Sequence, residues 1–266
     1  MLLDDIHSIY IVKKLNDHSE HIVNVANTIS NYFLKKYNIG EVPIHYISNR
    51  TLIISIGGDG TMLFSARIAS QNDCYVVGFN LGKLGFITTD IVEGNVISTL
   101  EELIHNSVVQ ERLLLTLGDN AVAMNEFLFQ PRGIGLPLHK FSLYNKEQLI
   151  THYNASGLMI STPTGSTGFA VSLGGAIVDP SVRAIEVLPL AAHSLMQGSH
   201  PIILPDTVEL TIKTEHNEID VIADGRLVET EVPLPMTVRV APKPAKFVNI
   251  GDWNFFDVLV QKMGWK

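Results

Sequence analysis

An aspartate among three glycines is the residue in this sequence best placed to do chemistry. Within the stretch Thr51–Thr61, the run Gly57-Gly58-Asp59-Gly60 follows a short apolar segment and precedes a segment with helical spacing. The N–H groups of such a turn can bind phosphate oxygens, and glycine lets a bulky anion approach. A carboxylate repels phosphate, so Asp59 fits a base that takes the proton of a hydroxyl attacking phosphorus. The alternative is that Asp59 is the N-cap of the following helix.

Two further segments place polar side chains beside apolar strands. Ser161–Thr167 puts five hydroxyls into seven residues. This segment, called the hydroxyl loop below, can hydrogen-bond a polar ligand, or it is an ordinary Ser/Thr/Gly loop. The pair Asn125-Glu126 interrupts an apolar run. It indicates either ligand-binding groups or a polar pair on an edge strand.

The composition argues against several classes of protein. A net charge of −8 and a pI near 5.6 disfavour a nucleic-acid partner. The single cysteine, Cys74, excludes an intrachain disulfide and is expected to be buried and inert. The N-terminus is a poor signal peptide, and no apolar run reaches the roughly 18 residues of a membrane span. We therefore expect a soluble, cytoplasmic protein with no membrane partner.

The elements that must position these groups fall into two regions. In the first, short apolar strands alternate with helical stripes, which predicts a parallel sheet with its ligand at the carboxyl ends of the strands. Strands are expected at 8–13, 44–47, 52–56 and 74–79, and helices at 21–37, after the glycine turn, and at 96–105. A second glycine-rich turn, Asn80–Phe86, also follows a strand, so both turns can face one crevice.

From about residue 108 the pattern becomes that of an all-β, sandwich-like domain. Strand-like runs separated by Pro and Gly turns lie at 113–117, 122–130, 141–144, 158–161, 208–212, 219–223, 237–241 and 247–250. Helical pattern is limited to a turn near Ala170 and a segment near Ala184. Residues 254–265 again have helical spacing and are expected to dock back on the body of the protein.

Four of these segments, taken in order, resemble the NAD kinase family. They are GGDGT at Gly57–Thr61, NLGKLGF at Asn80–Phe86, NE at Asn125–Glu126 and STPTGST at Ser161–Thr167. Further similarity lies at His200–Pro205, Ala223–Arg226 and Phe255–Trp265. Diacylglycerol and sphingosine kinases share GGDGT, so the other three segments specify the resemblance. It implies an enzyme that uses Mg-ATP to phosphorylate the adenosine ribose 2′-hydroxyl of NAD, giving NADP.

The resemblance also implies an architecture. A Rossmann-like α/β domain would span residues 1–106 and a β-sandwich residues 107–250, with NAD between them. A C-terminal helix within 251–266 would return to the first domain. Family members form homodimers or homotetramers. The divalent metal is expected to arrive with ATP, because the sequence offers no dedicated protein cage for it.

The resemblance implies roles for individual residues. Asp59 would be the general base, and Gly57, Gly58 and Gly60 would let phosphates approach. Asn125 would lie near the adenine and Glu126 near the far ribose. Asp224 is a weaker candidate, from a neighbouring subunit or the sandwich edge. The remaining predicted nucleotide-binding residues are Thr61, Asn80, Gly82, Ser156, Thr162, Thr164, Ser166, Thr167 and Phe169.

Two positions depart from the family's usual pattern. Ser156 stands where the family has aspartate, and Phe169 stands where it has tyrosine and cannot donate a hydrogen bond. The hypothesis is weaker or altered binding at the nicotinamide end, with the phosphoryl-transfer centre intact. The double change Ser156→Asp with Phe169→Tyr is expected to tighten NAD binding, measured by titration. Unchanged affinity would favour the alternative, neutral drift compensated by His152 or Tyr153.

Two other functions compete with the kinase. A lipid or sphingoid-base kinase would share GGDGT, but the NE pair, the hydroxyl loop and the absence of an amphipathic membrane-binding stretch disfavour it. A non-catalytic dinucleotide-binding sensor would fit the departures at Ser156 and Phe169. Retention of Asp59 argues against the sensor.

Overall fold

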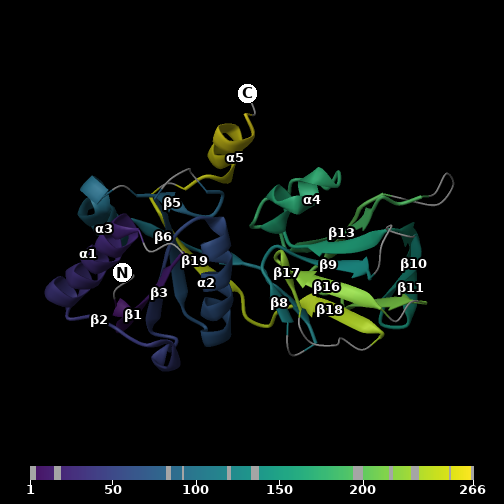
Figure 1. Cartoon of the computed structure of the whole chain (residues 1–266), viewed down its shortest axis with the longest axis horizontal. Helices are drawn as coiled ribbons and strands as arrows, with labels where there is room; N and C mark the ends of the chain where they lie inside the picture. Colours follow the sequence, from purple (N-terminus) through teal and green to yellow (C-terminus); the bar gives the residue numbers. More distant parts are fainter. Residues whose placement is uncertain are drawn as a thin grey trace. The chain divides into compact units, whose positions relative to one another are not determined.

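The computed structural model of the chain consists of two compact units (Figure 1). It describes residues 4–14, 19–81, 85–91, 93–118, 121–132, 138–193, 200–215, 218–228, 234–251 and 253–264. The first unit comprises Met1–Arg112 with Lys243–Lys266, and the second comprises Leu113–Pro242. Among the described residues, no helix has the length and apolar character needed to cross a membrane.

The first unit is built on a seven-stranded, mostly parallel sheet ordered β2-β1-β3-β4-β19-β6, with β5 beside β4. Its strands are β1 (Ser8–Lys13), β2 (Gly40–Glu41), β3 (Thr51–Ile56), β4 (Tyr75–Asn80), β5 (Thr89–Asp90), β6 (Ser107–Arg112) and β19 (Ala245–Ile250). Its helices are α1 (Glu20–Tyr37), α2 (Asp59–Asn72), α3 (Val96–His105) and α5 (Phe255–Met263), with 3-10 turns η2 (Ile44–Tyr46) and η3 (Glu93–Asn95). Only β6 runs antiparallel to its neighbour.

Helices cover both faces of this sheet, as Figure 1 shows for α1 and α3 on one side and α2 on the other. All six residues of β3 are buried for that reason. Leu52, Ile54 and Ile56 join one apolar cluster with residues of α1 and α3. β3 therefore ends in a rigid, fully buried layer, and the glycine turn that follows it is held at the carboxyl edge of the sheet.

The second unit contains two six-stranded antiparallel sheets, ordered β11-β10-β15-β18-β7-β8 and β14-β13-β12-β9-β16-β17. The strands are β7 (Leu115–Leu117), β8 (Ala121–Ala123), β9 (Glu126–Pro131), β10 (His139–Asn145), β11 (Gln148–Ala155), β12 (Gly157–Ser161), β13 (Ala184–Leu190), β14 (Ile202–Pro205), β15 (Leu210–Thr214), β16 (Ile219–Ala223), β17 (Arg226–Leu227) and β18 (Met236–Val240). Phe127, Phe129, Phe141 and Leu143 lie in the core that both sheets share. The turn η4 (Gly165–Thr167) and helix α4 (Phe169–Ser172) follow β12.

This architecture confirms the predicted fold class, an α/β domain followed by a sheet-rich domain. Cys74 is buried, and burial raises the pKa of its thiol to about 12, in line with an inert thiol. Three element predictions are wrong. The run 122–130 is not one strand but two, β8 and β9, which belong to different sheets. The strand expected at 44–47 is instead the 3-10 turn Ile44–Tyr46. Pro43 precedes this turn as its N-cap, and none of the three residues of the turn is buried. The segment from Ala184 is strand β13, since it pairs with β12 and β14.

The pairing of β6 with β19 determines where the chain passes between the two units. β6 and β19 pair along their whole length, and β19 adds to the first sheet beside β4. The chain therefore passes into the second unit after Arg112 and returns at Lys243, so the last strand and α5 both belong to the first unit. This pairing joins segments more than a hundred residues apart, and no local pattern announces it.

Candidate functional site

The glycine turn after β3 is tightly constrained. Gly57 donates its N–H to the carbonyl of Phe79 at 2.8 Å, and a Cβ on Gly57 would overlap the side chain of Thr61. Gly58 is the N-cap of α2, and Asp59 is the first helical residue. Glycine has no side chain with which to cap the helix, and the described residues supply no other side-chain cap. The alternative in which Asp59 serves as the N-cap is therefore wrong.

The carboxylate of Asp59 is instead bound by the loop after β4. Phe86 N donates to Oδ2 at 3.0 Å, and Ile87 N donates to Oδ1 at 3.4 Å. The hydroxyl of Thr88 lies 3.4 Å from Oδ1. Phe86, the last residue of the second predicted turn, thus lies next to the first turn at the carboxyl ends of β3 and β4. Asn80 ends β4, and its carbonyl accepts the N–H of Ile91 at 2.9 Å, whereas Gly82 lies outside the described residues.

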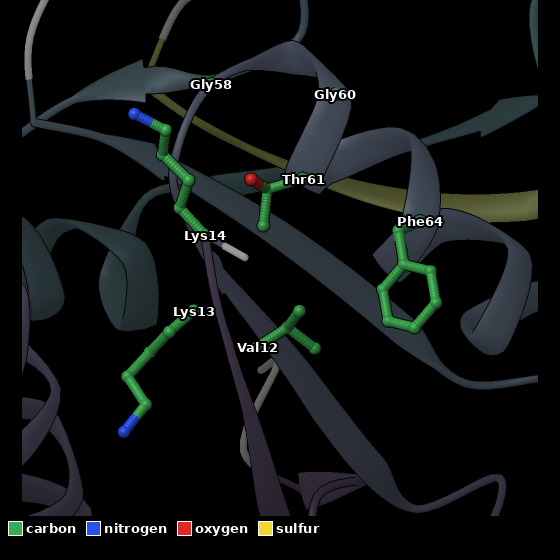
Figure 2. A pocket seen from close by; sticks show the side chains of 7 residues that line it. All are labelled: Val12, Lys13, Lys14, Gly58, Gly60, Thr61 and Phe64. Atoms are coloured by element: carbon green, nitrogen blue, oxygen red, sulfur yellow. The ribbon is translucent and has the colours of Figure 1, made fainter. Parts of the chain in front are cut away.

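A pocket of about 330 Å³ opens beside this turn. The pocket is lined by the end of β1 on one side and by the glycine turn with the start of α2 on the other. The lining residues are Val12, Lys13, Lys14, Gly58, Gly60, Thr61 and Phe64. Figure 2 shows the side chain of Lys14 extending toward Gly58, while Lys13 extends away from the turn. The ammonium group of Lys14 and the N-terminus of α2 make this a site suited to an anion (Figure 2).

Sequence reasoning missed Lys13 and Lys14. The signal that could have found them is a lysine pair at the end of the first strand, because β1 lies directly beside β3 in the parallel sheet. A Cβ on Gly58 or Gly60 would meet no atom within 4 Å, so side-chain packing does not require glycine at either position.

In the second unit, Asp224 organises the turn that carries Asn125 and Glu126. Its backbone has φ +47°, and its carboxylate accepts three consecutive N–H groups. The donors are Met124 at 3.0 Å, Asn125 at 2.7 Å and Glu126 at 3.3 Å. Burial raises the pKa of Asp224, and these three bonds oppose the shift. Because β9 lies between β12 and β16, the edge-strand interpretation of the NE pair is wrong.

Glu126 is a buried acid, with 8 % of its surface exposed. Its Oε2 has no hydrogen-bond partner among the described residues. Burial, followed by the nearby charge of Asp224, raises the pKa of Glu126 to about 7. An oxygen kept out of water with no partner is costly, and it suits a ligand group that supplies the missing hydrogen bond.

The hydroxyl loop docks on the same turn. Thr162 donates its hydroxyl to the carbonyl of Met124 at 2.6 Å and accepts the N–H of Gly165 at 3.1 Å. Ser166 donates to the carbonyl of Pro163 at 2.7 Å and accepts the N–H of Val178 at 3.0 Å. Both side chains are buried, so these hydroxyls hold the loop together.

The other predicted residues of this loop are placed differently. Thr164 is buried, whereas Thr167 is half-buried and its hydroxyl lies 3.3 Å from the carbonyl of Thr164. Phe169 begins α4 with 46 % of its surface exposed, and Ser156 is buried. The second unit therefore brings together Asn125, Glu126, Asp224 and the hydroxyl loop. Asp59, Thr61 and Asn80 lie in the first unit. The described residues contain no group of three His, Cys, Asp or Glu side chains suited to a metal ion.

The raised pKa of Glu126 makes protein stability depend on pH. The unfolded state loses this proton near pH 4.5 and the folded state near 7, so the folded state binds more protons in between. Stability should fall with rising pH across that window, by up to about 1.4 kcal/mol per pH unit. Glu126→Gln should lack this component, measured by urea unfolding at about pH 5 and about pH 8. The exposed Glu209→Gln should behave like the parent, and an equal slope in Glu126→Gln would contradict the assignment.

The chain matches two family models. One describes the ATP-NAD kinase N-terminal domain, over residues 7–108, and the other the ATP-NAD kinase C-terminal domain, over residues 124–250. An NAD kinase of Legionella pneumophila (strain Corby) is 32 % identical over 233 residues, covering 81 % of this chain and 76 % of that protein. One of Gemmatimonas aurantiaca is 35 % identical over 229 residues, covering 80 % and 77 %.

Two solved structures share the fold. A yeast NADH kinase complexed with NADH aligns with a TM-score of 0.78 and 25 % identity, covering 98 % of this chain and 88 % of that one. An NAD kinase from Archaeoglobus fulgidus in complex with ATP aligns with a TM-score of 0.74 and 22 % identity, covering 97 % and 98 %. With both domain models and most of the chain matched, this protein belongs to the ATP-NAD kinase family.

Proposed function

We propose that this chain is an NAD kinase that transfers a phosphoryl group from ATP to the adenosine ribose 2′-hydroxyl of NAD, with Asp59 as general base. The observation that carries the proposal is the position of Asp59. Its carboxylate is fixed at the first turn of α2, and its chain neighbours Gly58 and Gly60 line a pocket together with Lys14. Phosphoryl transfer needs positioned phosphates, neutralised charge and one group to receive the hydroxyl proton. The relatives are named NAD kinases.

The donor nucleotide is assigned to the pocket of the first unit. Its triphosphate would lie along Gly58 and Gly60, where backbone N–H groups and the ammonium group of Lys14 would meet the negative charge (Figure 2). Val12 and Phe64 form the apolar wall on which the base would pack. Magnesium would come bound to the triphosphate and offset its charge. Asp59 is the only acidic residue of the glycine turn, and both of its oxygens already accept hydrogen bonds from the loop after β4, so the turn offers no other carboxylate to bind the metal.

The dinucleotide is assigned to the second unit's turn and loop. Asn125 and Glu126 would bind it directly, and the unpartnered oxygen of Glu126 would accept a ribose hydroxyl. Thr164, Thr167 and Phe169 would line the same site. Thr162, Ser166 and Asp224 would shape it, because their polar groups already hold the loop and the turn. Ser156 is the position at which we expect altered contact with the nicotinamide side.

Two broader features of the family are extended to this chain. We expect a homodimer or homotetramer, which sedimentation velocity would distinguish from a monomer. We also expect a cytoplasmic location, where NAD and ATP are both available. The sensor and the lipid kinase are not favoured, because Asp59 and its surroundings are intact and both NAD kinase domain models match.

The test is NADP formation by the purified protein with NAD, ATP and Mg²⁺. NADP produced in proportion to enzyme, and absent when ATP is omitted, is the expected result. Repeating the assay with NADH and with polyphosphate would define the acceptor and the donor. Binding of NAD without any NADP formation would overturn the proposal and support the sensor.

Replacing both Lys13 and Lys14 with alanine should weaken binding of the donor. One charge-assisted hydrogen bond, from Lys14 to the triphosphate, would contribute about 1.5–3 kcal/mol, so the KM for ATP should rise at least about 10-fold. The KM for NAD should stay within about 2-fold, because the lysines line the pocket of the first unit. Initial rates with each substrate varied in turn measure both constants. Lys35→Ala, an exposed lysine in the last turn of α1, is the matched control, and an equal rise in both KM values would contradict the assignment.

A further inference from the structure

The loop Gly85–Thr88 surrounds the carboxylate of Asp59 from a different part of the chain. Both oxygens are engaged, Oδ2 by the N–H of Phe86 and Oδ1 by the N–H of Ile87 with the Thr88 hydroxyl beside it. Asp59 opens a helix, and its donors follow the next strand of the sheet, 27 to 29 residues later. This arrangement fixes the direction of the carboxylate independently of the helix that carries it.

Two glycines create the space that this contact needs. A Cβ on Gly85 would overlap Asp59 Oδ1 and Thr88 Oγ1. A Cβ on Gly78, in β4, would lie 2.8 Å from the Thr88 methyl and 2.8 Å from Met62 Sδ. Neither glycine has a positive φ, so backbone conformation does not explain them. The missing side chains leave room for Thr88 and for the carboxylate.

We propose that Gly85 and Thr88 are positioning residues for the general base. Together with Gly78 and the N–H groups of Phe86 and Ile87 they form a carboxylate socket, which holds Asp59 in the orientation that accepts the substrate proton. The proposal depends on Asp59 being the base, as argued above. A general base works only within a narrow range of positions, and a misplacement of about 1 Å can cost about 100-fold in rate. A base oriented by a further group is the recurring arrangement in enzymes that activate a hydroxyl.

The socket is anchored on two sides. The Thr88 methyl lies against β4 at Gly78, within the sheet. The ring of Phe86 lies below the ammonium group of Lys262, 5.9 Å from its centroid, which connects the loop to helix α5. A loop held at both ends can keep its donors in place while substrates bind and leave.

Three variants test the socket through steady-state kinetics. Thr88→Val removes the hydroxyl at constant shape and should lower kcat about 10-fold, with the KM values for NAD and ATP within about 2-fold. Thr88→Ser keeps the hydroxyl and should retain kcat within about 2-fold. Gly85→Ala forces the carboxylate to move and should lower kcat about 100-fold. A residue that only supports the fold would reduce the fraction of protein that is active, and kcat per active site would stay the same. The concentration of active sites is therefore titrated for each variant, so that kcat is calculated per active site.

A double-variant cycle with Asp59→Asn separates this inference from the proposed function. If the socket acts through Asp59, Thr88→Val should cost almost nothing further in the Asp59→Asn background. An equal loss of kcat from Thr88→Val in the parent and in Asp59→Asn would overturn the socket. Full kcat in both Thr88→Val and Gly85→Ala, while Asp59→Asn is impaired, would overturn it as well. Full kcat in Asp59→Asn would overturn the base assignment and the socket with it. Hydrogen exchange at the Phe86 amide should also accelerate in Asp59→Ala, and unchanged exchange would count against the contact.

Discussion

Asp59→Asn is expected to lower kcat for NADP formation by about 10²- to 10⁴-fold, the usual contribution of a general base. Asparagine keeps the size of the side chain but cannot take the proton of the 2′-hydroxyl. Its amide oxygen can still accept the N–H of Phe86, so the loop and the fold should persist. The KM values for NAD and ATP should change by less than about 3-fold, because the substrate contacts proposed above lie elsewhere. Steady-state kinetics measure all three constants.

Asp73→Asn is the matched control for this substitution. Asp73 ends the same helix in a left-handed C-cap and forms an ion pair with Lys246 at 2.6 Å. Its side chain is 40 % exposed, so the substitution should leave kcat within about 2-fold. Similar activity losses in both variants would point to helix α2 as a whole. Normal activity in Asp59→Asn would remove Asp59 from the role of base.

Gly165→Ala is expected to disrupt the dinucleotide site. A Cβ at this position would overlap the backbone carbonyl of Asn125 and crowd the Ser161 hydroxyl. Backbone atoms cannot rotate away as the end of a flexible side chain can, so the loop and the Asn125-Glu126 turn must separate. Overpacking of this kind costs about 1–3 kcal/mol of stability. The KM for NAD should rise more than about 10-fold, since the two predicted binding segments are displaced together.

Urea unfolding and initial-rate kinetics check the two parts of this prediction. Gly40→Ala is the control, because a Cβ there would meet no atom within 4 Å and its φ is not positive. Gly40→Ala should therefore retain both stability and the KM for NAD. A Gly165→Ala protein with normal NAD kinetics would show that the loop does not need to dock on Asn125.

The sequence alone determined the order of the chemical segments and the kind of element that carries each. Periods of two and 3.6 residues are local properties, so the strand before Gly57 and the helix at Val96–His105 are predictable from their own residues. The change from alternating strands and helices to strands alone likewise predicted an α/β domain followed by a sheet-rich one. The same local patterns predicted that Asn125, Glu126 and the hydroxyl loop lie next to strands.

Only the tertiary structure decided what the polar side chains contact. The carboxylate of Asp59 accepts a backbone N–H from a residue 27 positions away, and the carboxylate of Asp224 accepts the backbone N–H of Asn125, 99 positions away. The raised pKa of Glu126 depends on burial and on Asp224, neither of which is written in its neighbouring residues. β19 adds to the first sheet beside β4, although the sequence pattern assigned residues 247–250 to the β-sandwich. Short-range patterns fix secondary structure, whereas hydrogen bonds, burial and charge in a site come from segments that folding brings together.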